Sequence, residues 1–452
     1  MKIAVIGAAG VRTPLLVHGL AEVAERIALD DVALFDIDRE RLQPIVRVAS
    51  AVAADGRLQA RLQSANSAEE ALDGAAVVIS SIRVGGIQAR IQDETIAIAH
   101  GLVGQETVGA GGFACALRNL TAMIAYARLM DRVAPHATMV NFTNPVGIVS
   151  QALFQVSAVR MLGVCDTPLE LFEGIAQALG RDPASLEFDY FGLNHLGWVR
   201  AIRDDDGRDL LPTVLSSPEL IRKSYRYGLF PPEFIQKLGI LPSEYLYYYY
   251  FPEYAYQNIR KSGTSRGESI EGLNRELFSR LAEANDRDLL RVYERYLRER
   301  NATYFSLEAT AGEKRDDERP LYSQFSGYER IAVSLLDALA SKTPRTIPLT
   351  VRNNGALADL EPGDSVELPC KVSDAGVVPA RPGDAPETVK ELLVRVKEYE
   401  RLVAQAAITH SREIALEALV KNPLVGSPQI ATQILQDYLK TFGGRLGLSD
   451  AA

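Results

Sequence analysis

The feature that most constrains the fold is the alternation of short apolar strands and helices over the first 85 residues. Lys2–Ile6 has the pattern of a buried strand, and the turn Gly7-Ala8-Ala9-Gly10 follows it directly. Thr13 and Pro14 predict the start of a helix with Thr13 as its N-cap, because Thr caps helices and Pro suits the first helical position. Strands that alternate with helices predict a parallel, doubly wound sheet.

The same rhythm continues to about residue 167. A helical pattern over Arg39–Ala53 follows the second strand. The further strands are expected at Val32–Phe35, Ala75–Ser80, Thr138–Phe142 and Met161–Val164. We therefore expect residues 1–167 to form a Rossmann-like α/β domain with a parallel sheet.

The pattern changes from about Pro168 onward. Long helical stretches are expected at Ser279–Arg300 and Thr388–Ile408, with strand-like pieces between them at Ala309, Val351 and Val366–Lys371. We expect residues 168–452 to form a mixed α+β domain that carries substrate and metal residues and the oligomer contacts.

Four residues near the first turn are candidates for binding NAD: Gly7, Ala9, Gly10 and Asp36. A glycine turn between a strand and a helix lets a pyrophosphate approach the helix N-terminus. Asp36 ends the second strand, where a carboxylate accepts hydrogen bonds from a ribose diol and repels the 2′-phosphate of NADP. The glycine pattern is imperfect, since Ala9 stands where glycine is usual. A tight turn without a ligand is the alternative.

Composition excludes several classes of function. Lys and Arg total 49 against 58 Asp and Glu, for a net charge of −9, which argues against a nucleic-acid partner. No apolar run approaches the ~20 residues that a membrane helix needs, and Met1-Lys2 leads directly into a strand, so we expect neither a membrane span nor a secretory leader. Three cysteines are too few for a disulfide framework and favour the cytoplasm.

Polar residues gather at the ends of the expected strands and in loops, which is where open α/β sheets bind ligands. Taken by residue type alone, Cys165 can equally be a buried thiol, and His195 a hydrogen-bonded loop histidine. The segments are Arg83–Glu94, Gly104–Thr107 with the glycines at 109, 111 and 112, Asn141–Pro145, Gly163–Pro168 and Gly192–His195.

Several of these segments, in this order, resemble glycoside hydrolase family 4, the NAD- and divalent-metal-dependent 6-phospho-glycosidases and their relatives. The similarity extends nearly end to end. It is carried by Gly104-Gln105-Glu106-Thr107, Asn141-Phe142-Thr143-Asn144-Pro145, Cys165, Gly192-Leu193-Asn194-His195, Pro242–Tyr249, Ser265–Glu268, Arg352–Ala356 and Val366–Cys370.

The resemblance implies a reaction different from displacement by two carboxylates. NAD⁺ takes a hydride from sugar C3, a base removes the C2 proton, the C1 leaving group departs, water adds and the hydride returns. The resemblance implies Cys165 and His195 as ligands of Mn²⁺ and Tyr245 as the base. It also implies that Glu106 raises the basicity of Tyr245 and that Asp166 is the acid for the leaving group.

Arg90, Asn144 and Arg266 match substrate contacts of the family. We expect Arg266 near the 6-phosphate, because a guanidinium fork suits phosphate oxygens. The first loop departs from the family's Gly-Gly-Gly-Ser-x-Tyr-Thr-Pro: its Ser is absent and Arg12 is new. Arg12 could bind the sugar phosphate or another group such as a carboxylate, meet the NAD pyrophosphate, or be a solvated loop residue.

The resemblance divides over the preferred anomer. Asp166 after Cys165 is similar to the α-glucosidase branch of the family, whereas Arg83–Gly86, Gly109–Arg118 and the C-terminal half are more similar to the β-glucosidase branch. We expect a cytoplasmic 6-phospho-β-glucosidase that acts on a small sugar phosphate as a homodimer or homotetramer. The alternatives are a 6-phospho-α-glucosidase, a family 4 glycosidase for unphosphorylated sugars, an NAD-dependent hydroxy-acid dehydrogenase and a non-catalytic sugar-phosphate sensor.

Overall fold

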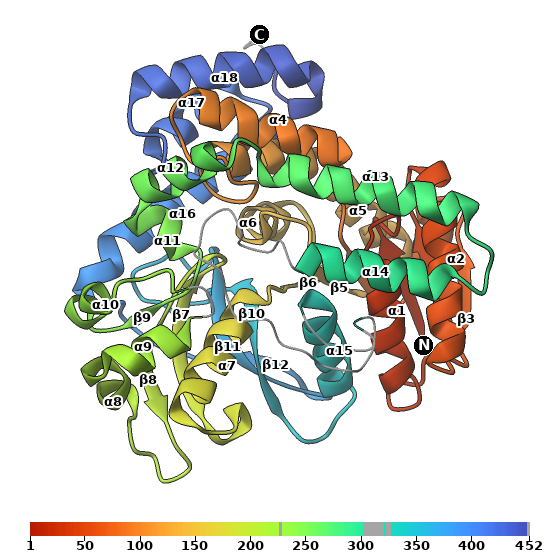
Figure 1. Cartoon of the computed structure of the whole chain (residues 1–452), viewed down its shortest axis with the longest axis horizontal. Helices are drawn as coiled ribbons and strands as arrows, with labels where there is room; N and C mark the ends of the chain where they lie inside the picture. Colours follow the sequence, from red (N-terminus) through yellow and green to blue (C-terminus); the bar gives the residue numbers. More distant parts are fainter. Residues whose placement is uncertain (226–227, 302–320, 322–326, 450–452) are drawn as a thin grey trace.

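The computed structural model describes residues 1–225, 228–301, 321 and 327–449 (Figure 1). Within them, nine strands form one sheet in the order β12-β11-β10-β6-β5-β4-β1-β2-β3. Strands β1 to β6 are parallel, and their order 3-2-1-4-5-6 is that of a Rossmann sheet. Their bounds are β1 (Lys2–Ile6), β2 (Asp31–Phe35), β3 (Arg61–Ser64), β4 (Val77–Ser80), β5 (Thr138–Asn141) and β6 (Arg160–Gly163). The predicted fold class is confirmed.

Helices alternate with these strands and bury the central ones on both faces, which explains why β1, β2 and β4 are largely apolar. All four residues of β4 and of β5 are buried. The edge strand β3 was not predicted, because its residues Arg61–Ser64 are polar and partly exposed. The helices are α1 (Thr13–Val23), α2 (Arg39–Asp55), α3 (Ala68–Leu72), α4 (Gly86–Ala99), α5 (Gly109–Val133), α6 (Val146–Val156) and α7 (Thr167–Leu179).

The C-terminal half completes the same sheet. Strand β10 (Arg345–Arg352) pairs antiparallel with β6, and β11 (Ser365–Ser373) and β12 (Gly376–Pro379) follow outward. A separate small sheet contains β7 (Glu187–Leu193), β8 (Leu196–Arg203) and β9 (Leu241–Pro242). The second half is therefore mixed α+β, as predicted. The division at residue 167 stays a prediction, because strands from both sides share one sheet.

Of the remaining helices, α8 and α10 pack on the small sheet, whereas α14 packs on α2, α15 on α1, and α16 on α5 and α6 (Figure 1). Helix α13 lies across α4 and packs on it. The bounds are α8 (Leu211–Ser216), α9 (Pro218–Ser224), α10 (Pro232–Leu238), α11 (Leu246–Tyr250), α12 (Pro252–Ser262), α13 (Arg266–Glu283), α14 (Leu289–Asn301), α15 (Tyr328–Leu339), α16 (Glu387–Thr409), α17 (Arg412–Lys421) and α18 (Pro428–Phe442).

Two local predictions are wrong, and a third lies outside the described residues. The helix expected over Ser279–Arg300 is broken between α13 and α14, because the Asn285 side chain accepts from the Arg287 N–H and donates to Asp288, which competes with helical bonding. Arg12, and not Thr13, is the N-cap residue of α1. The strand expected at Ala309 is not among the residues that the structure describes.

Candidate active site

Gly7 follows β1 directly and lies against Ser81, the first residue after the neighbouring strand β4. Gly7 has a φ of +89°, and a Cβ there would lie 2.4 Å from the carbonyl oxygen of Ser81, so no other residue fits without displacement. Asp36 accepts hydrogen bonds from the backbone N–H groups of Ala9, at 3.0 Å, and Asp38, at 2.9 Å. These bonds hold the carboxylate beside the turn. Gly10 is exposed at the turn's outer side.

Arg12 has a partner that the sequence did not reveal. Its guanidinium makes two bonds of 2.5 Å to the carboxylate of Glu329 on α15, whose side chain is only 3% exposed. The neighbouring Val11 carbonyl accepts a 2.8 Å bond from the Tyr293 hydroxyl on α14. Helices distant in sequence therefore hold the first turn, and the positive charge of Arg12 is compensated within the protein.

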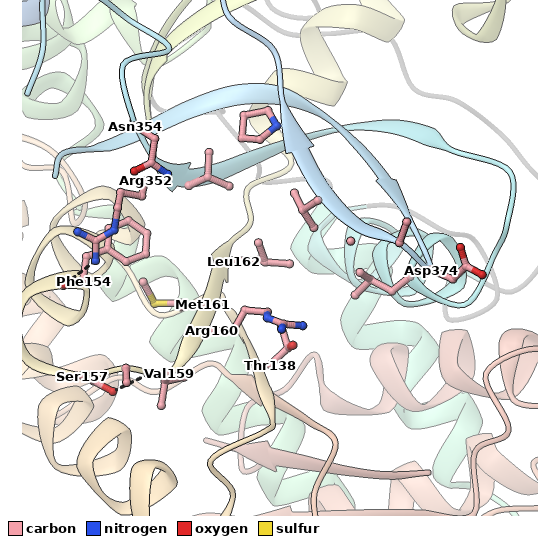
Figure 2. A pocket seen from close by; sticks show the side chains of 17 residues that line it. Thr138, Phe154, Ser157, Val159, Arg160, Met161, Leu162, Arg352, Asn354 and Asp374 are labelled. Carbon is pink, nitrogen blue, oxygen red and sulfur yellow. Dashed lines mark hydrogen bonds between the residues drawn. The ribbon is translucent and has the colours of Figure 1, made fainter. Parts of the chain in front are cut away.

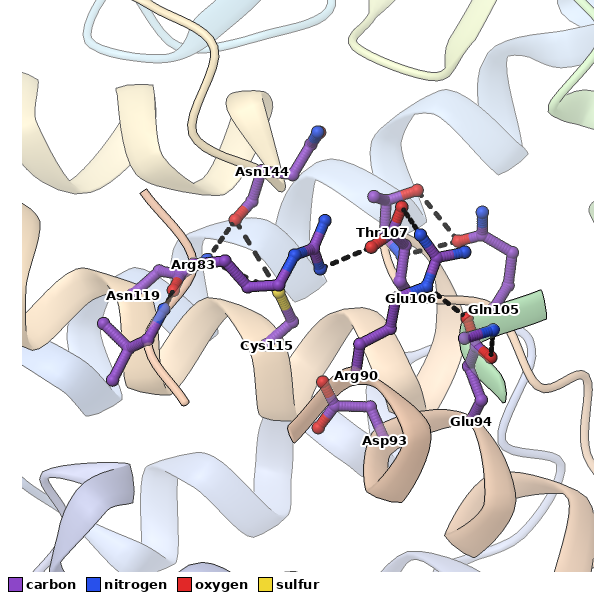
Figure 3. A network of polar contacts seen from close by, with 12 residues as sticks. Arg83, Arg90, Asp93, Glu94, Gln105, Glu106, Thr107, Cys115, Asn119 and Asn144 are labelled. Carbon is purple, nitrogen blue, oxygen red and sulfur yellow. Dashed lines mark hydrogen bonds and ion pairs between the residues drawn. The ribbon is translucent and has the colours of Figure 1, made fainter. Parts of the chain in front are cut away.

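A chain of alternating charges lies beyond β4 and along α4 (Figure 3). Glu106 forms ion pairs with Arg83 and with Arg90, the latter at 2.9 Å, and Arg90 donates a 2.7 Å bond to Glu94. Burial opposes ionisation of Glu106, but the two arginines outweigh it and lower its pKa to about 2. Glu106 is therefore a permanent anion. The Arg90 guanidinium is buried, which opposes its charge, yet Glu106 and Glu94 raise its pKa.

Asn144 begins the turn that follows β5. Its carbonyl accepts a 2.7 Å bond from the Asn119 side chain, which places the residue against α5 (Figure 3). Its side-chain oxygen Oδ1 is buried and has no hydrogen-bond partner among the described residues. Buried polar atoms of this kind are rare in folded proteins and call for a partner, so Asn144 is suited to contact a ligand.

Cys165 and His195 face each other across the ends of β6 and β7. Cys165 Sγ lies 3.3 Å from His195 Nε2 and 3.9 Å from a carboxylate oxygen of Asp166, the N-cap residue of α7. Two ligands of a divalent metal such as zinc, with bonds of about 2.3 Å to sulfur and about 2.1 Å to nitrogen, lie about 3.1–3.6 Å apart. Burial lowers the pKa of His195 to about 3, so the imidazole is neutral, as a ligand must be. This pair fits a metal.

In the part of the chain that the structure describes, no third protein ligand joins the pair. Among the described residues, no group of three or more His, Cys, Asp and Glu side chains is arranged to hold a metal ion. A metal on Cys165 and His195 would thus keep positions for water or for hydroxyl groups of a ligand. Without a metal, burial raises the pKa of the Cys165 thiol well above its usual range, and nearby Asp166 and Glu367 add to the effect.

Tyr245 completes the arrangement at the N-cap of α11. Its ring stacks on the His195 imidazole, with centroids 3.7 Å apart and planes 7° from parallel. Burial raises the pKa of Tyr245 well above its usual range, and Cys165 and Glu106 raise it further, while Arg90 opposes them.

The structure thus brings together the predicted residues Cys165, His195, Tyr245, Glu106 and Arg90. Arg266 is the first residue of α13, and the next residue, Gly267, donates to Glu94. Glu268 accepts from the Ser265 N–H and so forms a capping box at the start of this helix.

Other side chains of the site were not singled out from the sequence. Arg83 and Glu94 are the two ends of the polar segment Arg83–Glu94 noted in the sequence. Glu94 could have been found from its i,i+4 spacing to Arg90 on a helix. Glu329 had no sequence signal. Glu367 on β11 accepts bonds from Tyr190, at 2.7 Å, and from Asn194, at 3.1 Å, next to His195.

A cavity of about 760 Å³ lies elsewhere (Figure 2). It is lined by residues such as Phe154, Arg160, Met161, Arg352 and Asp374, from the end of α6 and from β6, β10 and the turn after β11. No predicted site residue lines it.

Among the described helices, none combines the length and apolar character needed to cross a bilayer.

The fold and the site define a Rossmann-type enzyme in which a glycine turn and a buried polar centre share the carboxyl edge of one sheet. The chain belongs to glycosyl hydrolase family 4: the family model "Family 4 glycosyl hydrolase" matches residues 2–181, and the model of the C-terminal domain matches residues 190–425. The resemblance seen in the sequence is confirmed.

Three similar proteins illustrate the relationship. The chain is 28% identical to a probable 6-phospho-beta-glucosidase of Bacillus subtilis (strain 168), over 97% of this chain and 96% of that protein. A 6-phospho-beta glucosidase structure from Thermotoga maritima with manganese, NAD⁺ and glucose-6-phosphate has a TM-score of 0.81 and 26% identity, covering 99% and 100% of the chains. A 6-phospho-alpha-glucosidase structure from gut microorganisms with NAD and Mn²⁺ has a TM-score of 0.82 and 25% identity, covering 99% of each chain.

Proposed function

We propose that this protein hydrolyses 6-phosphoglucosides, with 6-phospho-β-glucosides as its preferred substrates, using NAD⁺ and Mn²⁺. The observation that carries the proposal is the stacking of the Tyr245 ring on the His195 imidazole. The Nε2 atom of the same imidazole lies 3.3 Å from Cys165 Sγ. Family membership favours hydrolysis over the hydroxy-acid dehydrogenase that the sequence left open. Relatives with both NAD and Mn²⁺ bound support the two cofactors.

The residues at the sheet edge divide into a cofactor side and a sugar side. Gly7, Ala9 and Gly10 would lie against the NAD pyrophosphate, and Asp36 would accept from the adenosine ribose. Cys165 and His195 would hold Mn²⁺. When bound, NAD⁺ supplies a reversible hydride acceptor and the metal supplies a Lewis acid beside the sugar hydroxyls.

Tyr245 is proposed to take the C2 proton on its Oη. The proton is acidic only while C3 is a ketone, so a weak base suffices at that stage. The fixed negative charge of Glu106 raises the proton affinity of Tyr245, and a cation on the His195 side would allow the phenol to ionise. Asp166, beside Cys165, is proposed to protonate the leaving oxygen. Arg90, Asn144 and Arg266 are proposed to bind the sugar, with Arg266 towards the 6-phosphate.

The choice between anomers rests on hydrolysis of paired substrates. We expect 4-nitrophenyl 6-phospho-β-glucoside to be hydrolysed faster than its α counterpart in NAD⁺ and Mn²⁺, and the unphosphorylated pair to be poor substrates. The Cys165-Asp166 pair favours the α-glucosidase as the second candidate. Faster hydrolysis of the α substrate would reverse the assignment, and equal rates without the phosphate would remove the phosphate requirement. Net accumulation of NADH would instead indicate a dehydrogenase.

Gly7→Ala should damage the fold, whereas Gly10→Ala should damage mainly the cofactor site. A Cβ at Gly7 meets the Ser81 carbonyl at 2.4 Å and forces a positive φ on alanine, which costs on the order of 1–2 kcal/mol from the backbone alone. A Cβ at Gly10 meets its nearest atom, the Gly7 carbonyl oxygen, at 3.4 Å. Thermal melting with and without NAD⁺ checks both. A lowered melting temperature of the apo Gly10→Ala variant would contradict this reading.

Arg12→Ala should destabilise the protein by on the order of 2–3 kcal/mol, because it leaves the buried Glu329 carboxylate without its partner. Arg12→Ala with Glu329→Gln should recover much of that loss. Urea unfolding of the single and double variants checks this result. In Glu329→Gln alone, loss of the ion pair with Glu329 would let Arg12 strengthen binding of glucose 6-phosphate if it faces the sugar phosphate. Weaker NAD⁺ binding in Arg12→Ala would instead place it at the cofactor.

The homodimer or homotetramer and the cytoplasmic location stay predictions. The location follows from the low number of cysteines, and sedimentation of the purified protein measures the oligomeric state directly.

A further inference from the structure

Glu94 is a buried carboxylate that the proposed mechanism does not use. It lies on α4, four residues after Arg90, and its side chain is 1% exposed. Its two oxygens have different partners: Oε1 accepts from Arg90 Nε at 2.7 Å, and Oε2 accepts from the backbone N–H of Gly267 at 2.7 Å (Figure 3). Burying a charged carboxylate costs free energy unless ion pairs and hydrogen bonds compensate for the lost water.

The second partner connects Glu94 to the other arginine of the sugar side. Gly267 follows Arg266 directly, in the first turn of α13. Carboxylates are favoured at helix N-termini, where backbone N–H groups lack internal partners. The N-terminus of α13 already has its own cap, since Ser265 and Glu268 form a capping box. Glu94 therefore adds a bond from a different helix to an end that is already capped.

Gly267 allows this close approach. A Cβ on Gly267 would lie 3.0 Å from Glu94 Oε2 and 3.0 Å from the Ile91 side chain of α4. The backbone at this position has no positive φ, so the conformation itself does not require glycine. A side chain here would therefore press on Glu94 and Ile91 of α4, and these would have to shift to accommodate it.

We propose that Glu94 is a positioning residue for substrate binding: its one carboxylate fixes the guanidinium of Arg90 and, through Gly267, the start of the helix that carries Arg266. The inference rests on the proposed function, in which both arginines contact the sugar phosphate. Substrate affinity then depends on the α4–α13 contact, and the two arginines act as one unit. Glu94 itself touches neither substrate nor cofactor.

Glu94→Gln tests the role of the charge and of the two bonds. The amide has an oxygen at only one of the two positions that now accept, so its NH2 group faces either the Arg90 guanidinium or the Gly267 N–H, and one of the two bonds is lost. We expect glucose 6-phosphate to bind the NAD⁺-loaded variant at least ten-fold more weakly by calorimetry, and KM to rise more than kcat falls. NAD⁺ affinity should not change. Glu268→Gln is the matched control, because it also removes a carboxylate from the start of α13 but leaves the bond between Glu94 and Arg90 intact. We expect this variant to bind glucose 6-phosphate as the wild type does.

Gly267→Ala gives an independent variant that does not remove a charge from the core. Alanine is the better helix former by about 1 kcal/mol, so a purely structural role of this position predicts an unchanged or higher melting temperature and unchanged affinity. The proposal predicts a several-fold loss of glucose 6-phosphate affinity, because the added Cβ displaces either the Glu94 carboxylate or the start of α13 and so disturbs the contact between them. In an Arg90→Lys background, Glu94→Gln should cost less than in the wild type.

If wild-type protein neither binds glucose 6-phosphate nor hydrolyses 6-phosphoglucosides, the proposed function fails and this inference with it. If the wild type binds and Glu94→Gln binds equally well, only the inference fails. Equal losses for NAD⁺ and glucose 6-phosphate, or additive effects with Arg90→Lys, would assign Glu94 to general stability. Should Glu94→Gln not fold, unchanged affinity in Gly267→Ala overturns the inference by itself.

Discussion

Chelation with EDTA is expected to abolish turnover, and Mn²⁺ is expected to restore it. Cys165→Ser should weaken Mn²⁺ binding by more than about 100-fold, since loss of a partner that only orients a ligand already costs about 10–100-fold. The reason is chemical: a thiolate is lost, and a serine hydroxyl does not ionise near neutral pH. Titration of Mn²⁺ followed by electron paramagnetic resonance measures the affinity without relying on activity.

Cys370→Ser supplies the matched control. Cys370 is also buried, but it lies on β11, where its Sγ donates to the Leu368 carbonyl oxygen at 3.4 Å. We expect this variant to bind Mn²⁺ as the wild type does. Full activity in excess chelator, with no Mn²⁺ detected on the enzyme, would remove Cys165 and His195 from the metal site. Equal weakening in Cys370→Ser would show that the loss comes from the fold.

The Rossmann part of the fold was predictable because its signals are local. Each parallel strand is a short apolar run, and the first turn carries its glycine at the one position where a Cβ would meet Ser81. The break between α13 and α14 was missed because Asn285 and Asp288 act through side-chain bonds within an otherwise helical pattern. The joining of β10 to β6 was not predictable, since no local pattern specifies which strand edge a later strand will find.

The site divides in the same way. Residues next to strand ends, such as Cys165, could be singled out from their position, and the family resemblance assigned them roles. The partner of Arg12 could not, because Glu329 lies 317 residues further along the chain. Nor could the tie from Glu94 to Gly267, which spans 173 residues. Both contacts depend on how helices pack, and helix packing depends on shapes that a single sequence does not display.

Tyr245→Phe is expected to lower kcat by about 10²–10⁴-fold, the usual contribution of a positioned base. Phenylalanine keeps the ring that stacks on His195 at 3.7 Å, so the affinities for Mn²⁺ and NAD⁺ should not change. Tyr248→Phe is the control, because it removes a hydroxyl from the neighbouring ring, 5.9 Å from that of Tyr245. A comparable loss in Tyr248→Phe, with Tyr245→Phe fully active, would move the base to Tyr248.

Incorporation of deuterium at C2 of the product tests whether Tyr245 removes the C2 proton. If Oη of Tyr245 removes the C2 proton and solvent exchanges with the phenol, product formed in D₂O carries deuterium at C2. In Tyr245→Phe the rate of this incorporation should fall together with kcat, because both depend on the same proton transfer. Rapid wild-type turnover with only hydrogen at C2 would indicate direct displacement by carboxylates, as in most glycosidases. Unchanged incorporation in Tyr245→Phe, with slow release of the leaving group, would place Tyr245 at a later step and assign the base to another residue.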